Sequence, residues 1–106
     1  MASTTNLAIE QTRQVAHQLK KNGFKIEKTF LFGSQLAGTA TPDSDIDVAL
    51  ASDKFSGVRF KDILMLIPLL TGLPSKIEIH PYSTKDFFDP NNWFAEHIRA
   101  TGLEVK

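Results

Sequence analysis

Two aspartates, Asp45 and Asp47, are spaced two residues apart at the start of an alternating apolar segment that ends at Leu50. Side chains alternate between the two faces of a β-strand, so these carboxylates would share one face, with Cα atoms about 6–7 Å apart. Two carboxylates that close repel each other by a few kcal/mol at an effective dielectric constant of about 20. A divalent cation between them reverses that sign, and Mg²⁺ favours carboxylates combined with substrate phosphates. The spacing therefore predicts a Mg²⁺ site at Asp45 and Asp47.

A second feature precedes the aspartates in the sequence. Gly33 and Ser34 follow the β-prone segment Lys28–Phe32 and open a stretch with room for one or two helical turns, up to Gly38. N–H groups at the start of a helix bind phosphate without a basic side chain. Glycine lets the backbone approach a phosphate closely, and the serine hydroxyl adds a donor. Gly33 and Ser34 are therefore candidates to bind phosphate.

A third carboxylate, Glu78, lies between Ile77 and Ile79 in the β-prone segment Lys76–His80. Alternation places the two isoleucines on one face and Glu78 on the other. If this strand lies beside the strand of Asp45 and Asp47, Glu78 completes a three-carboxylate cluster. Its role would be to accept the proton of an attacking hydroxyl or to share a second metal ion.

These segments alternate with predicted helices. Helices are expected over about Asn6–Asn22, from about Arg59 until Pro68 kinks or ends it, and from Asp89-Pro90 to Gly102. Strands are expected over Lys28–Phe32, Asp45–Leu50, Lys76–His80 and Leu103–Val105. This order predicts an α/β (α+β) fold, with a small mixed β-sheet flanked by helices. The length of 106 residues predicts a single domain, residues 1–106.

Composition restricts the classes of partner and site. Twelve basic residues balance twelve acidic ones, and this neutral charge argues against binding to extended nucleic acid. The chain has no cysteine, so thiolate metal sites are excluded, and the spacing of His17, His80 and His97 does not suit metal binding. We therefore expect the histidines to be surface or structural residues. We also expect no membrane span and a cytoplasmic location, because the start of the chain lacks the pattern of a signal peptide.

The motifs are more specific together than singly. Gly33-Ser34, then Gly38, then Ser44-Asp45-Ile46-Asp47-Val48 resembles the signature of the polymerase-β-like nucleotidyltransferase superfamily. Within it, the chain resembles the small stand-alone group called minimal nucleotidyltransferases (MNT proteins). The motif covers residues 30–50, and the order of helices and strands around it is similar over nearly the whole chain. The resemblance implies the minimal nucleotidyltransferase core.

The same resemblance implies roles for individual residues. Gly33 and Ser34 would hold the triphosphate, and Asp45 and Asp47 would bind Mg²⁺. Glu78 lies where the family carries its third carboxylate, commonly an aspartate, and would act as a catalytic residue and metal ligand. The implied reaction transfers a nucleoside monophosphate, AMP from ATP, to a hydroxyl acceptor. Proteins that this chain resembles commonly pair with a HEPN-family protein, often as the antitoxin of a toxin–antitoxin system, and the partner can itself carry the hydroxyl.

Two departures from the family pattern keep other functions open. Ala37 stands where many members have an arginine, and Glu78 is one methylene longer than the usual aspartate. Both departures favour a noncatalytic module that binds nucleotide, or only the partner, and neutralises the partner by contact. A second alternative is a small-molecule nucleotidyltransferase of the aminoglycoside-modifying kind, which the short chain disfavours.

Overall fold

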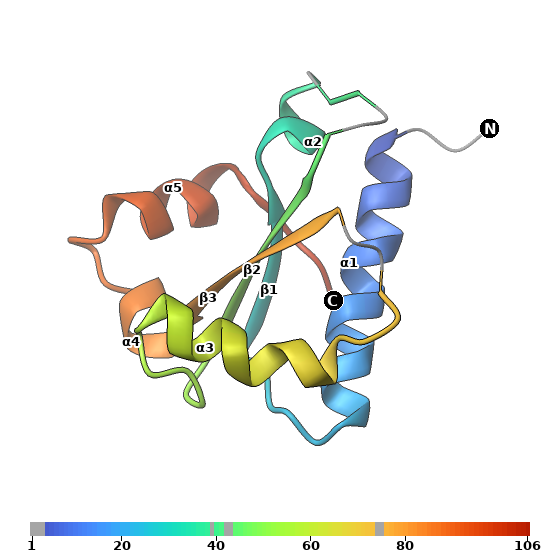
Figure 1. The fold of residues 1–106 in the computed structure, drawn as a ribbon. Helices are drawn as coiled ribbons and strands as arrows, with labels where there is room; N and C mark the ends of the chain where they lie inside the picture. The colour runs from blue at the N-terminus through green and yellow to red at the C-terminus, as the bar shows by residue number, and fades with distance from the viewer. Residues whose placement is uncertain (1–3, 39, 42–43, 74–75) are drawn as a thin grey trace.

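The computed structural model describes residues 4–38, 40–41, 44–73 and 76–106 (Figure 1). The helices are α1 (Thr4–Lys21), α2 (Ser34–Ala37), α3 (Arg59–Leu66), the 3₁₀ helix η1 (Ile67–Leu69), α4 (Thr84–Phe87) and α5 (Trp93–Thr101). The strands are β1 (Lys28–Phe32), β2 (Ile46–Ser52), β3 (Ile77–Ser83) and β4 (Leu103–Glu104). The sequence predicts a turn at Pro42 and Asp43 and a connection through Pro74, and these positions lie outside the described residues. Within the described ranges, no helix has the length and apolar character needed to cross a membrane.

The four strands form one mixed sheet in the order β3-β2-β1-β4. β1 is antiparallel to both β2 and β4, whereas β3 runs parallel to β2. The predicted mixed sheet flanked by helices is therefore confirmed. In the register of the sheet, Asp47 lies opposite Phe32 of β1 and opposite Glu78 of β3. The predicted neighbourhood of Asp47 and Glu78 thus follows directly from strand pairing.

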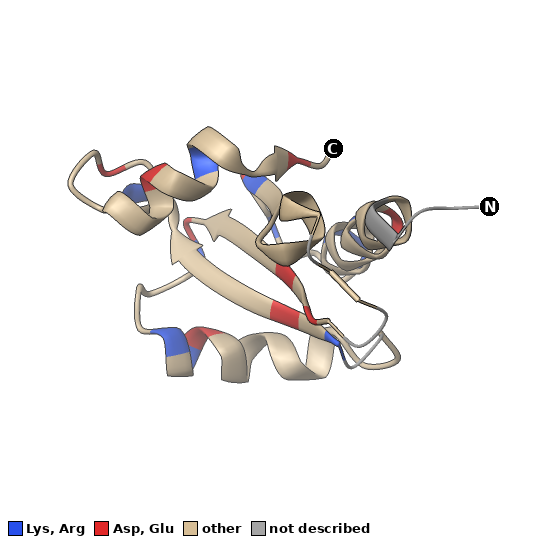
Figure 2. Ribbon diagram, turned by 90° about the horizontal axis from the view of Figure 1, so that it is seen from above, with Lys and Arg blue, Asp and Glu red and all other residues tan. Residues whose placement is uncertain are grey.

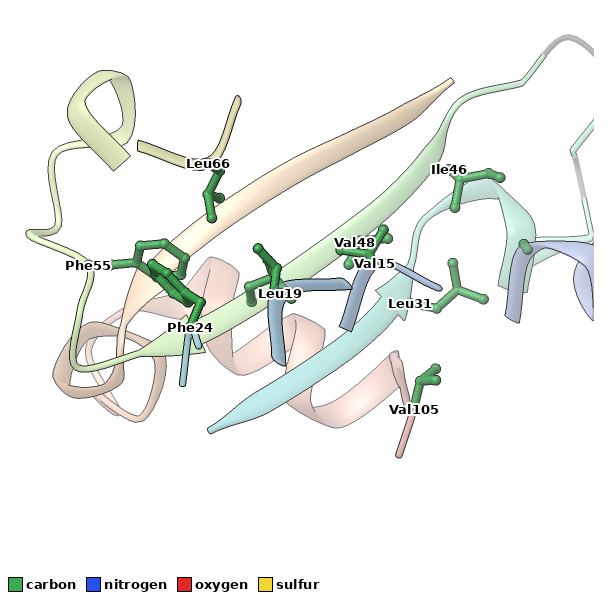
Figure 3. Close-up of a cluster of buried hydrophobic side chains, with 11 residues drawn as sticks. Val15, Leu19, Phe24, Leu31, Ile46, Val48, Phe55, Leu66 and Val105 are labelled. Atoms are coloured by element: carbon green, nitrogen blue, oxygen red, sulfur yellow. The ribbon is translucent and has the colours of Figure 1, made fainter. Parts of the chain in front are cut away.

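Helices cover both faces of the sheet (Figures 1 and 2). On one face, α1 and α3 pack against alternate residues of β1 and β2, and this core is the cluster drawn in Figure 3. On the opposite face, α4 and α5 pack against the other set of alternate strand residues. The first core contains Val15, Leu19, Leu31, Ile46, Val48, Leu50 and Leu66, and the second contains Phe30, Phe32, Ala49, Ala51, Phe87, Ala95 and Ile98. Alternation therefore turns Asp47 toward the α4–α5 face.

Three local predictions differ from the structure. The last helix begins at Trp93, because the side chain of Asn92 caps it by accepting the N–H of Ala95, whereas Asp89 stabilises the preceding turn. Helix α4 was not predicted. It is a short element whose N-cap is Ser83, which accepts the N–H of Asp86. Strand β3 continues through Pro81 to Ser83, which an edge strand permits because one side of its backbone has no neighbour to bond.

Candidate active site

In the candidate site, the backbone of Gly33 lies very close to the carboxylate of Asp47. Gly33 joins β1 to α2 with φ of 83° and ψ of −148°, a backbone conformation that is essentially restricted to glycine. A Cβ atom at this position would lie 2.5 Å from Oδ2 of Asp47, far inside van der Waals contact. Glycine is thus required twice, for its backbone angles and for the space that the Asp47 carboxylate fills.

Ser34 is the first residue of α2 and follows this contact directly. The short helix ends at Gly38, which has φ of 76° in the left-handed region. Of the two residues predicted to bind phosphate, Gly33 therefore lies next to the Asp47 carboxylate, and Ser34 follows it in the sequence. Their role in binding nucleotide stays a prediction.

Three side chains from two neighbouring strands converge on the α4–α5 face of the sheet. Nε2 of His80 lies 3.2 Å from Oδ1 of Asp47 and 3.9 Å from Oε1 of Glu78. One oxygen or nitrogen atom from each of the three side chains lies within 4.8 Å of the others, a spacing that suits one cation. Figure 2 shows acidic segments on adjacent strands at this place.

Of the two expectations for His80, surface or structural, the structure supports the structural one, and it places the ring beside the candidate metal ligands. Its side chain is only 15% exposed and hydrogen-bonds to Asp47. The sequence held a signal for this position. His80 follows Glu78 by two residues in the same strand, so the alternation that placed Glu78 on the site face places His80 there as well.

Arg59, at the start of α3, determines which nitrogen of His80 carries the proton. Nη1 of Arg59 lies 3.1 Å from Nδ1 of His80. A guanidinium group has only donors, so Nδ1 must accept and the proton of the neutral ring must sit on Nε2. Nε2 therefore donates to Oδ1 of Asp47. In this arrangement His80 orients the Asp47 carboxylate and offers no lone pair to a metal ion.

Arg59 also bonds to Glu78, with 3.4 Å between Nη2 and Oε1. It therefore brings a positive charge to the site from a different element than the one that carries Ala37. The sequence does not point to Arg59, because this residue lies far from the motif and meets Glu78 only through the packing of α3 beside β3. No periodicity or spacing in the sequence signals that contact.

Asp45 differs from Asp47 in that it lies outside strand β2. It is exposed and precedes β2, and its backbone carbonyl accepts a hydrogen bond from the Gln35 side chain at 3.3 Å. Among the described residues, the side chains that converge are those of Asp47, Glu78 and His80, and Asp45 is not one of them. The assignment of Asp45 as a metal ligand stays a prediction.

The donor set fits a hard divalent cation. Asp47 and Glu78 supply carboxylate oxygens, the ligands that Mg²⁺ and Mn²⁺ prefer, and Mg²⁺ usually completes its shell with water and substrate phosphate. Half of the Glu78 side chain is exposed, which leaves it free to adjust to an ion. Asp47 and Glu78 therefore form a candidate site for a divalent cation.

Aromatic side chains line the sheet beside the cluster. The ring of Phe32 contacts the ring of His80 edge-on at 5.0 Å. Tyr82 follows His80 on the same face of β3, where burial raises the pKa of its hydroxyl above the ordinary value and the charge of Arg59 only partly opposes this. Tyr82 is thus an uncharged phenol at neutral pH.

Comparison with known proteins defines the class of this chain. Residues 13–102 match the family described as polymerase beta, nucleotidyltransferase. The chain therefore belongs to the polymerase β nucleotidyltransferase family, whose chemistry is nucleotidyl transfer and whose members generally use divalent metal ions. No curated protein sequence matches this chain significantly.

The structural comparison agrees with that assignment at the level of the fold. The crystal structure of a proposed nucleotidyltransferase from Sulfolobus solfataricus is similar, with a TM-score of 0.62 and 12% sequence identity. The match covers 98% of this chain and 87% of that chain. At this identity the likeness establishes a shared fold.

The Gly33 contact yields a matched pair of substitutions. Gly33→Ala should displace the Asp47 carboxylate and weaken Mn²⁺ binding, measured by calorimetry, by about tenfold or more. Gly38→Ala is the control, because Gly38 also has a positive φ but has open space around a new Cβ. Both variants should lose stability from backbone strain, about 1–2 kcal/mol for Gly38→Ala in the left-handed region and about 1–3 kcal/mol for Gly33→Ala, yet only Gly33→Ala should lose metal affinity. Equal metal affinity in the two variants would show that the contact is irrelevant to the site.

A second prediction tests the proton position on His80. Removing Arg59 frees Nδ1 to carry the proton, so Nε2 becomes a ligand of the kind that Zn²⁺ favours over Mg²⁺. Arg59→Ala should therefore raise the ratio of Zn²⁺ to Mg²⁺ affinity by about tenfold or more, and adding His80→Ala should abolish the gain. Lys61→Ala, which removes a charge from the same helix, controls for electrostatics. A wild-type protein that already selects Zn²⁺ through His80 would contradict the assignment.

Proposed function

We propose that this protein transfers AMP from ATP to a hydroxyl group of a HEPN-type partner protein, as the antitoxin of a toxin–antitoxin pair. The observation that carries the catalytic part is the convergence of Asp47 and Glu78 beside Gly33 in a chain of the nucleotidyltransferase family. The partner and the acceptor follow from the resemblance to the minimal nucleotidyltransferases.

The proposed reaction assigns a task to each part of the site. The acceptor oxygen attacks the α-phosphorus of ATP, the bond from that phosphorus to the bridging oxygen breaks, and pyrophosphate leaves. Glu78 takes the hydroxyl proton. Gly33 and Ser34 would hold the phosphates, and Asp45 and Asp47 would hold Mg²⁺, which would supply positive charge to neutralise the phosphates. His80 keeps the Asp47 carboxylate oriented.

Arg59 supports turnover despite Ala37. Many relatives place an arginine near the second glycine of the motif, and here Arg59 supplies a guanidinium group beside Glu78 and His80 instead. Its side chain is about half exposed, so it can reach a phosphate group at the same site. Arginine binds phosphate oxygens with two parallel N–H groups, which makes it well suited to steady a triphosphate.

An exposed apolar stripe on α3 supports a protein partner. Phe60, Leu64 and Ile67 recur at helical spacing and are 73%, 52% and 58% exposed. Contiguous apolar surface of this kind marks sites of protein–protein interaction. The stripe begins on α3, whose first residue, Arg59, contacts the candidate catalytic carboxylate, and it continues onto η1 with Ile67. A partner that docks here would therefore sit next to the site.

The catalytic role of Glu78 can be separated from binding. Glu78→Gln should retain ATP binding in calorimetry, yet slow transfer of label from [α-³²P]ATP to the partner by roughly 10²–10⁴-fold, since general-base catalysis contributes that much. Glu96→Gln, which neutralises an exposed carboxylate on α5, is the control and should transfer at the wild-type rate. Undiminished transfer by Glu78→Gln would remove Glu78 from the chemistry.

The partner assignment is tested on the co-expressed pair. Mass spectrometry should show an adenylyl increment on the HEPN-type protein that disappears with Asp45→Asn/Asp47→Asn. Leu64→Asp on the α3 stripe should weaken the complex in a pull-down, whereas Leu7→Asp, at a similarly exposed position on α1, should not. A partner that is bound and silenced but unmodified would favour the noncatalytic antitoxin. A protein that modifies only small hydroxyl compounds would favour the aminoglycoside-type enzyme.

A further inference from the structure

Two aromatic side chains form a right-angled pair at the start of α5. The rings of Trp93 and Phe94 are 5.9 Å apart between centroids, with an angle of 88° between their planes. Trp93 is 75% exposed and Phe94 is 39% exposed. Exposed aromatic rings cost free energy in water, so a pair fixed in this geometry is a candidate binding surface.

A series of ring contacts connects this pair with the candidate active site. Phe94 meets Phe32 edge-on at 6.1 Å, and Phe32 meets His80 edge-on at 5.0 Å. His80 in turn donates to Asp47. Phe32 is also the residue directly before Gly33, so the aromatic series and the proposed phosphate-binding turn begin at the same point of β1.

We propose that Trp93 and Phe94 bind the base of the nucleoside triphosphate. The inference rests on the proposed nucleotide-binding function and adds to it the position of the base. With the phosphates at Gly33 and the metal ion at Asp47, the nucleoside extends toward α5. There the base stacks on the face of one ring and meets the other ring edge-on, both favourable aromatic geometries.

The chemistry of this surface suits a base better than a phosphate. Residues 93–95 carry no charge, and the side chain of Asn92 is already used as the cap of α5. The exposed groups are π faces, and every base has a π face to stack on them. Stacking of this kind is tolerant of sequence, so ATP and GTP should bind here with affinities within a few-fold of each other.

Trp93 provides the readout, because it is the one tryptophan of the 106-residue sequence. ATP with Mg²⁺ should quench its fluorescence. Inorganic tripolyphosphate with Mg²⁺ should bind in competition with ATP but leave the fluorescence nearly unchanged, since it has no base.

Variants separate the base from the phosphates. In calorimetry, Trp93→Ala and Phe94→Leu should each weaken ATP binding roughly 5- to 150-fold, the usual worth of one stacking contact, without changing tripolyphosphate affinity. Trp93→Tyr should restore most of the loss. Phe88→Leu is the control, because Phe88 is a similarly exposed phenylalanine, 45% against 39% for Phe94, that packs on Phe87 instead.

The outcomes distinguish this proposal from the one it rests on. If the wild-type protein binds ATP but Trp93→Ala and Phe94→Leu bind it equally well, the base-binding proposal is overturned and nucleotide binding stands. If these variants lose the partner protein and keep ATP, the surface is a protein interface and the proposal is again overturned. If wild type binds neither ATP nor tripolyphosphate, both proposals fall.

Discussion

The candidate site depends on how closely the backbone of Gly33 approaches the carboxylate of Asp47. A side chain of any size at position 33 would occupy the space of that carboxylate. The approach is fixed by the β1–β2 register, which sets Phe32 opposite Asp47, and by the two cores that hold both strands from above and below. The packing of apolar residues far from the chemistry therefore determines where one carboxylate oxygen lies.

Beside that contact, polar side chains form a hydrogen-bonded network, and each hydrogen bond restricts the position or the protonation of the next side chain. Arg59 donates to Nδ1 of His80, so the other ring nitrogen must donate to Asp47. Arg59 also pairs with Glu78, which lies beside Asp47 in the sheet. Two carboxylates placed on adjacent strands would repel each other, and the charge of Arg59 offsets that repulsion. Helix α3 therefore contacts the site through the charged side chain of Arg59, in addition to packing its apolar face against the sheet.

Alternation along β-strands was enough to predict much of this arrangement. The two-residue alternation of side chains places Asp47 and Glu78 on one face of the sheet, and the pairing of β2 with β3 brings them side by side. The same rule places His80 on this face, because it follows Glu78 by two residues in β3, whereas the spacing of the three histidines along the chain gives no sign of it. Helix α4 is too short to show periodicity, and the start of α5 was misplaced because Asn92, not Asp89, is the cap.

The position of Arg59 in the site could not be predicted from local sequence patterns. Its contact with Glu78 arises from the way α3 packs beside β3, and long-range packing leaves no pattern along the chain.

Because the Arg59–Glu78 pair is exposed, its two side chains can also exchange each other for different partners. Both side chains are about half exposed, and exposed ion pairs contribute only about 0–1 kcal/mol. A divalent cation carries twice the charge of a guanidinium group and binds carboxylate oxygens directly, so it competes for Glu78 on favourable terms. A guanidinium group displaced in this way would stand beside the phosphates that accompany the ion. Under the proposed function, the same arginine would neutralise carboxylates before the ion binds and phosphate oxygens afterwards, and it would supply the cation that the motif lacks at Ala37.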